Sequence, residues 1–316
     1  MTLFNFTRHF QIQYVNDGGR YGNLLFRVGS MYGIGKTLDR IACLEYAFTV
    51  SFRSEFKKVF PNLHNYVLLE DCWTDKSKIA EFENKIWNYV NVSKLDKYAD
   101  FKHLRLYTGV LECPAFFFNV RHEICKMFEF SASFNQEIDE LAKQVFGDDK
   151  SPKICAHIRR SDFFNGGHPL LPSYEPFTSK ALDYLATTVS KEKKVDKVSF
   201  LLLNDDIDFT NNAAKQVKKN SHVKNIFTTK NFKPIEDMGV AIRHCDYFLL
   251  TSSGSTFGWW IAYLMPDSKQ QNTNHVPLFK TFSEIEFFPP EWNRLVHDVK
   301  SDAVFVQNRS IPGIHI

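Results

Sequence analysis

The chain has 316 residues, of which 44% are hydrophobic and 24% charged, as expected of a globular protein with a sizeable core. These values exclude a disordered chain, a collagen-like repeat and a small disulfide-dense protein, and the length predicts about two domains or one large α/β unit. The formal net charge of only +3 argues against a dedicated nucleic-acid-binding protein, which usually carries a strong basic patch.

The termini and the cysteines bear on the cellular compartment. No run of about 18 apolar residues is present, and residues 1–10 lack the apolar core of a signal peptide. We therefore expect either a cytosolic protein or the soluble part of a protein whose anchor is missing. The six cysteines include no C-x-x-C pair, which argues against a structural zinc site, and their even number allows disulfides without assigning them. Sequons beginning at Asn5, Asn91 and Asn308 are compatible with a secretory protein.

Strand and helix patterns alternate in the first half of the chain. Residues 12–15 predict a short strand, a glycine-rich turn follows, and apolar residues from Leu24 to Leu38 recur at helical spacing. Residues 41–48 predict a second strand, residues 61–130 show no regular pattern, and residues 133–145 predict a helix. The polar segment 147–152 predicts a linker between an N-terminal domain, 1–150, and a C-terminal domain, 151–316.

The second half shows a cleaner alternation. Strands are predicted at 154–158, 198–203, 223–227 and 247–250, and helices at 179–189, 213–219, 235–244 and 257–264. The unbroken apolar run 198–203 is typical of a parallel strand that is covered on both faces. This order predicts a doubly wound, Rossmann-like unit, in which ligands bind beyond the carboxyl ends of the strands.

Three polar segments occupy such positions. In Gly19-Arg20-Tyr21-Gly22-Asn23, glycines allow close approach of a ligand, and the amides at a helix start favour an anion. The alternative is a strand–turn–helix connection with Asn23 as the N-cap. In His157-Ile158-Arg159-Arg160-Ser161-Asp162, two arginines at a strand end suit phosphate oxygens, and the alternative is a surface Arg–Asp pair.

The third segment, residues 251–260, joins a strand to an apolar helix through hydroxyl residues and glycines. Its amides and hydroxyls suit a phosphate, and the alternative is a serine-rich N-cap turn. We expect Trp259 and Trp260 to pack the helix rather than to stack on a base. Gly33-Ile34-Gly35-Lys36-Thr37 ends like a P-loop but lies late in a helical pattern, and Asp206-Ile207-Asp208 lacks evident partner ligands for a metal. We therefore reject both as sites.

Taken together, the segments resemble a known family. Gly19–Asn23 followed by Leu24-Leu25-Phe26 is similar to the G-R-x-G-N-x-x-F motif of α-1,2-fucosyltransferases, and His157–Asp162 matches their H-x-R-R-x-D motif. Leu203-Asn204-Asp205-Asp206 resembles their S-D-D strand end, with Asn204 in place of serine. Glu236-Asp237-Met238 and Ser255-Thr256-Phe257-Gly258-Trp259-Trp260 match their last motif. The resemblance extends from about Asn16 to Leu264, and residues 61–130 match nothing recognisable.

The resemblance implies a GT-B-like α/β fold, with two Rossmann-type domains whose parallel sheets flank a cleft. The expected reaction transfers L-fucose from GDP-β-L-fucose to a galactoside hydroxyl, in α-1,2 linkage with inversion and without a metal ion or cofactor. The N-terminal domain would lie on the acceptor side, and the C-terminal domain would bind GDP-fucose. The expected partners are GDP-fucose and a glycan with terminal galactose, not nucleic acid. Location in the Golgi lumen is expected, as a type II membrane protein whose anchor is absent from this sequence, or as a soluble secretory protein.

The resemblance also implies individual roles. Arg159 would meet the β-phosphate, Arg20 and Asn23 the phosphates or the fucosyl hydroxyls, and His157 and Asp237 the guanine. Asp162 is the candidate base, or only orients an arginine. The predicted donor-binding set is Arg20, Gly22, Asn23, His157, Arg159, Arg160, Asp237, Ser255, Thr256 and Phe257, and the catalytic set is Asn23, Arg159 and Asp162. Alternatives are another GDP-fucose transferase, a non-catalytic protein that binds glycan or GDP-sugar, and a cytosolic α/β protein in which the motifs are structural.

Overall fold

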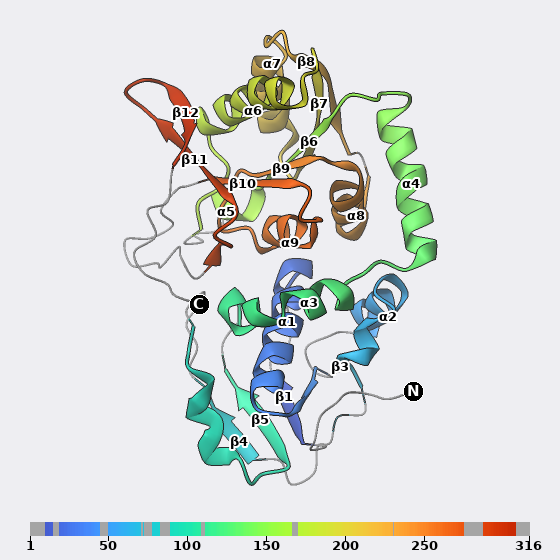
Figure 1. Cartoon of the computed structure of the whole chain (residues 1–316), viewed down its shortest axis with the longest axis vertical. Helices are drawn as coiled ribbons and strands as arrows, with labels where there is room; N and C mark the ends of the chain where they lie inside the picture. The colour runs from blue at the N-terminus through green and yellow to red at the C-terminus, as the bar shows by residue number, and fades with distance from the viewer. Residues whose placement is uncertain are drawn as a thin grey trace. The chain divides into compact units, whose positions relative to one another are not determined.

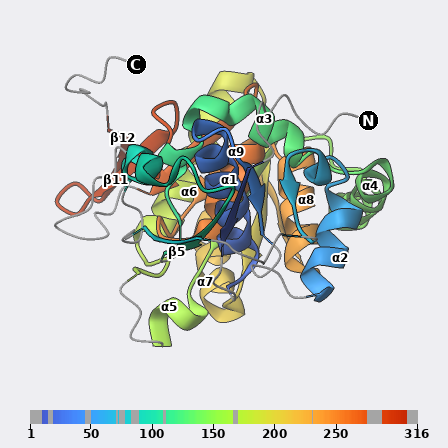
Figure 2. The same cartoon turned by 90° about the horizontal axis from the view of Figure 1, so that it is seen from below.

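The computed structural model describes residues 10–14, 19–44, 50–70, 72, 78–82, 89–108, 111–165, 170–229, 231–274 and 287–307. The chain forms two units (Figure 1; Figure 2 gives a second view). The first comprises Met1–Glu137 with Thr281–Pro289, and the second comprises Ile138–Lys280 with Pro290–Ile316. Each unit is built around one sheet.

The sheet of the first unit has five parallel strands in the order β3-β2-β1-β5-β4. The strands are β1 Gln11–Tyr14, β2 Ile41–Cys43, β3 Val67–Leu68, β4 Lys78–Glu81 and β5 His103–Tyr107. Helix α1, Tyr21–Thr37, connects β1 to β2 and is buried from Leu24 to Gly35. The strand predicted at 41–48 is confirmed only over 41–43, and residues 45–49 lie outside the described part.

Helices and short 3-10 turns complete the first unit. The α-helices are α2 Val50–Val59, α3 Arg121–Met127 and α4 Ala132–Phe146, which continues into the second unit; the 3-10 turns are η2 Leu63–Asn65, η3 Val92–Tyr98, η4 Pro114–Phe116 and η5 Phe118–Val120. Phenylalanines pack between them: the ring of Phe60 lies 5.3 Å from that of Phe128 and 5.6 Å from that of Phe130. Phe60 and Phe128 are buried, so these rings contribute to the core of the first unit.

The sheet of the second unit has seven strands in the order β12-β11-β10-β9-β6-β7-β8, and every described pairing is parallel except that of β11 with β12. The strands are β6 Lys153–Ile158, β7 Val198–Asn204, β8 Val223–Thr228, β9 Tyr247–Leu250, β10 Gln270–Asn274, β11 Asn293–Asp298 and β12 Ala303–Val306. The apolar run predicted as a covered parallel strand is β7, which is buried over its first six residues.

Helices cover both faces of this second sheet (Figure 1). They are α5 Ser161–Asn165, α6 Phe177–Lys193, α7 Ile207–Val217, α8 Pro234–His244 and α9 Thr256–Leu264. Alternate residues of β6 point to opposite faces: Ile154, Ala156 and Ile158 pack in one core cluster with α6. Cys155 and His157 face the other side, where α8 and α9 lie. Helix α7 begins at Ile207, six residues earlier than predicted, because Asp206 caps it.

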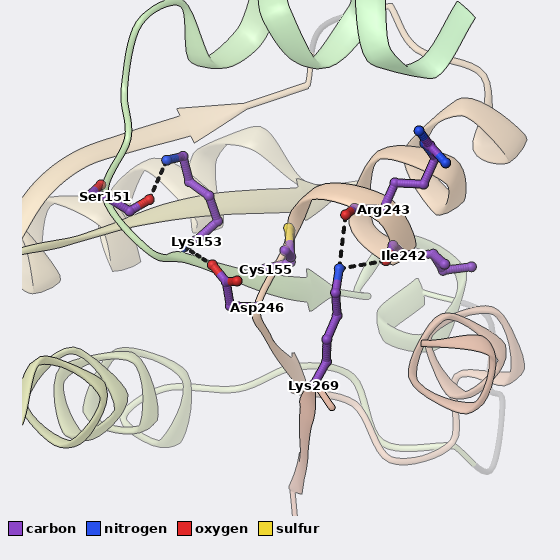
Figure 3. The surroundings of a disulfide bond; sticks show 8 residues. Ser151, Lys153, Cys155, Ile242, Arg243, Asp246 and Lys269 are labelled. Atoms are coloured by element: carbon purple, nitrogen blue, oxygen red, sulfur yellow. Dashed lines mark hydrogen bonds between the residues drawn. A yellow bond between two sulfur atoms is a disulfide. The ribbon is translucent and has the colours of Figure 1, made fainter. Parts of the chain in front are cut away.

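Two disulfides are present. Cys43–Cys72 joins β2 to the segment after β3, and Cys155–Cys245 joins β6 to the residue that follows α8. Asp246 accepts the amide of Lys153, at 2.8 Å, and Lys269 Nζ donates to the carbonyl oxygens of Ile242 and Arg243 in the last turn of α8, at 2.9 Å each (Figure 3). A cation is favourable at the carboxyl end of a helix dipole. The disulfide and Asp246 therefore fasten the carboxyl end of α8 to the amino-terminal half of β6, and Lys269, the residue before β10, binds the last turn of the helix.

Candidate functional site

The register of two neighbouring strands brings an arginine pair and an aspartate pair together. Ile158 of β6 is paired with Asn204 of β7, so residues 159–160 and 205–206 leave the sheet side by side at its carboxyl edge. Each guanidinium forms an ion pair with one of the aspartates: Arg159 with Asp205 and Arg160 with Asp206. The two aspartates follow the two arginines by 46 residues in the sequence, and the parallel pairing of β6 with β7 brings them together.

Arg159 is held by two carboxylates. Its Nη2 lies 2.5 Å from Asp162 Oδ1, its Nη1 lies 2.7 Å from Asp205 Oδ2, and its side chain is 16% exposed. Its amide donates to the hydroxyl of Ser173, at 2.9 Å. The predicted Arg–Asp pair therefore exists, but it belongs to a larger, partly buried cluster at the strand end.

Arg160 is enclosed by aromatic and polar groups. Its guanidinium lies 4.7 Å from the ring centre of Phe164 and 4.2 Å from that of Phe209, distances at which cation–π attraction operates. Its Nε donates to Asp206 Oδ2, at 2.9 Å, and its Nη1 to the carbonyl oxygen of Ser173, at 2.6 Å. These contacts hold the guanidinium of Arg160 at the end of β6.

Asp205 organises the loop that carries both arginines. Its Oδ1 accepts the amide of Arg160, at 2.8 Å, and its Oδ2 accepts the hydroxyl of Ser161, at 2.7 Å. The sequence reading did not assign a role to Asp205 or to Ser173. The acidic pair after an apolar strand was a usable signal for Asp205, whereas nothing local distinguishes Ser173 from other serines.

His157 is buried at the end of β6 and hydrogen-bonded to the start of α9. Its Nε2 lies 2.9 Å from the hydroxyl of Ser255, and its ring centre lies 5.4 Å from that of Phe257. Burial, and secondarily the charge of Arg159, lowers the pKa of His157 to about 4, so the ring is neutral near pH 7. Among the described residues, its buried Nδ1 has no hydrogen-bond partner.

The third motif forms the start of α9. Ser255 is the N-cap, and its hydroxyl accepts the amide of Gly258 at 3.4 Å. Gly258 is required by space, because a Cβ there would lie 2.4 Å from Leu250 and 2.6 Å from the ring of His157. Thr256 and Phe257 open the helix and are half-buried. The serine-rich N-cap turn is therefore present, and it contacts His157.

Trp259 and Trp260 are fully buried in the same helix. The ring of Trp259 stacks on Tyr263 at 4.6 Å and lies 5.6 Å from Trp292. The expectation that the two tryptophans pack the helix is confirmed.

Asp237 lies in the first turn of α8, which begins at the carboxyl end of the sheet. Its Oδ1 is buried and has no hydrogen-bond partner among the described residues. Burial, with a smaller contribution from the charge of Glu236, raises the pKa of Asp237 to about 7. A carboxyl group so shifted is a candidate for ligand contact.

The N-terminal motif lies in the first unit. Gly19 has φ +95°, which favours glycine, and α1 begins two residues later. Asn23 is the third residue of the helix rather than its N-cap: its Oδ1 accepts the amide of Arg20 at 3.4 Å, and its Nδ2 donates to the carboxylate of Glu112. Gly22 is buried, and Arg20 is exposed. Glu112, only 5% exposed, was missed because it lies in the region without a pattern.

Both rejected motifs have structural roles. Gly33–Thr37 is the last part of α1, where a Cβ on Gly33 would meet the carbonyl oxygen of Phe116 at 1.9 Å. Asp206 caps α7 by accepting the amide of Phe209 at 3.0 Å. Among the described residues, no group of three or more His, Cys, Asp or Glu side chains could hold a metal ion. In the same part of the chain, no helix is long and apolar enough to cross a membrane.

Known proteins are similar to this chain in sequence or in fold. The family described as "Glycosyl transferase family 11" matches residues 38–295. A galactoside 2-α-L-fucosyltransferase of Caenorhabditis elegans is 24% identical over 315 residues, and the match covers 89% of this chain and 75% of the relative. A second galactoside 2-α-L-fucosyltransferase of C. elegans is 32% identical over 169 residues, which cover 50% of this chain and 45% of that relative. The NodZ α-1,6-fucosyltransferase, in crystals soaked with GDP-fucose, is 12% identical with a TM-score of 0.53, covering 95% of this chain and 99% of NodZ. The predicted GT-B-like α/β fold class is confirmed.

Proposed function

The chain belongs to glycosyl transferase family 11, and we propose that it transfers L-fucose from GDP-β-L-fucose to a galactoside hydroxyl, in α-1,2 linkage with inversion and without a metal ion. The names of its C. elegans relatives support the galactoside and the linkage. One observation carries the proposal: the carboxyl edge of a single sheet gathers a charged arginine, a helix N-terminus and two buried polar atoms without described partners. Ligands of parallel α/β sheets bind at this edge.

The two buried polar atoms suit a guanine. Asp237 Oδ1 is an acceptor for the N1 and N2 protons of guanine, which adenine lacks in that arrangement. His157 Nδ1 belongs to a neutral imidazole and lies on the face of the sheet that α8 and α9 cover, the face to which α8 brings Asp237. Leaving a buried polar group unpaired costs about 1–3 kcal/mol, and a bound base would remove that cost.

The diphosphate would bind Arg159 and the start of α9. The leaving nucleoside diphosphate gains negative charge as the sugar–oxygen bond breaks, and preorganised donors for such charge contribute about 3–4 kcal/mol each in other enzymes. Thr256 and Phe257 supply amides at the helix N-terminus, where the dipole favours an anion, whereas the amide of Ser255 donates to the carbonyl oxygen of Ser252 at 3.0 Å. With these donors the reaction needs no metal ion.

A phosphate has to compete with carboxylates for Arg159. Asp205 also bonds the amide of Arg160 and the hydroxyl of Ser161, and its side chain is 23% exposed against 38% for Asp162. We therefore propose that the diphosphate displaces Asp162, while Asp205 keeps the guanidinium in place. The ion pair favours an orienting role for Asp162 over that of base.

Arg20, Gly22 and Asn23 remain proposed contacts of the phosphates or the fucosyl hydroxyls. The hydrogen bond from Asn23 to Glu112 supports a fixed orientation of this amide. We also propose the Golgi lumen as the location, because disulfides such as Cys43–Cys72 and Cys155–Cys245 persist in oxidising compartments.

Calorimetry with GDP, GDP-fucose and ADP, in the presence of EDTA, tests the donor site. We expect GDP and GDP-fucose to bind, ADP not to bind, and Arg159→Ala to lose binding. Arg243→Ala is the matched control, because Arg243 pairs with Asp139 at the other end of α8. Transfer to β-galactosides and linkage analysis of the product then test the acceptor. Absence of GDP binding at millimolar concentration contradicts the proposal, and binding with a product of another linkage restricts it to the donor.

A further inference from the structure

The N-cap residue of α9 has a contact that a role in phosphate binding does not explain. Ser255 is 3% exposed, and its hydroxyl oxygen lies 2.9 Å from Nε2 of His157. The same oxygen accepts the amide of Gly258, at 3.4 Å. The hydroxyl group is therefore already engaged on two sides before any ligand is bound.

The direction of the hydrogen bond between the two side chains follows from their partners. A serine hydroxyl has one proton to donate, and among the described residues Nε2 of His157 is the acceptor within reach of Ser255 Oγ. The neutral imidazole carries one proton, so a ring that accepts at Nε2 holds its proton on Nδ1. Nδ1 is the buried atom without a described partner.

We propose that Ser255 is a positioning residue, which donates to Nε2 of His157 and thereby makes Nδ1–H a hydrogen-bond donor to O6 or N7 of guanine. This inference rests on the proposed function, since it concerns the same nucleotide site. Both O6 and N7 are acceptors, whereas adenine has an amino group in place of O6. The opposite tautomer would direct a lone pair at these atoms and would repel them.

The packing of α9 holds the ring for this task. A Cβ on Gly258 would lie 2.6 Å from Cδ2 and 3.2 Å from Cγ of His157, so the helix backbone lies directly against the Nε2 side of the ring. The ring of Phe257 lies 5.4 Å away, centre to centre. Confined in this way, the imidazole has its tautomer determined by Ser255 and its orientation determined by α9.

A second serine–histidine pair serves as a matched control. The hydroxyl of Ser190, on α6, lies 3.0 Å from Nδ1 of His222 and is also bonded to the carbonyl oxygen of Val195. Helix α6 covers the opposite face of the sheet. Ser190→Ala therefore removes a similarly buried hydroxyl without touching His157.

The first experiment reads the tautomer directly. Two-bond ¹H–¹⁵N correlation spectra of the full chain with ¹⁵N-labelled histidine distinguish Nδ1–H from Nε2–H. We expect Nδ1–H for His157 in the wild type and in Ser190→Ala, and a mixture in Ser255→Ala. Ser255→Asp retains the N-cap, but a carboxylate can only accept, so it should shift the proton to Nε2. Nε2–H in the wild type, or an unchanged tautomer in both Ser255 variants, overturns the proposal.

The second experiment measures the affinity for GDP and for two analogues. In 6-thio-GDP the acceptor O6 is replaced by the weaker acceptor sulfur, and 7-deaza-GDP lacks the acceptor N7. The wild type should bind one analogue about threefold to tenfold more weakly than GDP, as for the loss of one neutral hydrogen bond. Ser255→Ala should lose this discrimination, and Ser255→Thr, which keeps a hydroxyl, should retain it.

If Ser255→Ala weakens the binding of all three nucleotides by one factor, Ser255 is a phosphate ligand or only a cap, and the proposal is wrong. If the wild type binds no GDP, the proposed function fails together with the guanine contact. The spectra then still decide whether Ser255 sets the tautomer of His157.

Discussion

Asp237→Asn should stabilise the folded protein at high pH and weaken its binding of GDP. Burial raises the pKa of this carboxyl group to about 7 in the folded chain, from the 3.8 of an ordinary aspartate. The folded state thus binds more protons than the unfolded state between these values, so the free energy of unfolding falls as the pH rises through that range. Asparagine has nearly the same size and shape as aspartate but has no charge to desolvate.

The magnitude follows from the two pKa values. Between pH 5 and pH 8 the wild type should lose about 2.5 kcal/mol of unfolding free energy relative to Asp237→Asn. Urea denaturation of both proteins at several pH values measures this difference, in which the titration of all other groups cancels. A difference that is constant over this range refutes the reasoning.

The same carboxyl group links GDP binding to pH. Guanine donors favour the carboxylate, so GDP binding should release a proton from Asp237 at pH 6 and none at pH 8. Calorimetry in buffers of different ionisation enthalpy counts this proton. Asp237→Asn should release none and should bind GDP more weakly at both pH values. An unaltered GDP affinity in this variant contradicts the assignment of Asp237 to the guanine.

Three further predictions test other parts of the structure. Arg159→Ala should lower fucosyl transfer at least about 100-fold with the fold intact, because it removes the cation proposed for the leaving phosphate; near-normal rates would contradict this. Gly258→Ala should lower the free energy of unfolding by about 1–3 kcal/mol and weaken GDP binding, because its Cβ would press on Leu250 and His157; a urea curve like the wild type's would show that the site can adjust. Replacing Cys155 and Cys245 by alanine should lower the free energy of unfolding by about 2–5 kcal/mol, measured by urea denaturation. An unchanged urea midpoint would mean that this disulfide does not stabilise the fold.

The alternation in the second unit could be predicted because it depends on local patterns. Strand β9, 247–250, has the predicted bounds, and the unbroken apolar run 198–203 is β7. Helix α7 begins earlier than predicted because residues 206–212 are mostly polar and show no helical period, whereas the N-cap of Asp206 sets its start. Residues 61–130 resisted prediction because their strands have only two to five residues, too few to show a period.

The candidate site was only partly predictable. The motifs named Arg159, Asp162, His157 and Ser255, but they could not show what each side chain contacts. Glu112, which accepts from Asn23, lies in the region without a pattern, residues 61–130, and carries no local signal.

By itself, the sequence determined the fold class of this protein and the order of its motifs, because hydrophobic periodicity and strand-to-helix transitions are properties of neighbouring residues. Only the tertiary structure decided which charges meet. The register of β6 against β7 brings Arg159 to Asp205, and the packing of α9 on β6 brings Ser255 to His157. Such contacts depend on residues far apart in the chain, and their partners become neighbours only when the sheet has formed.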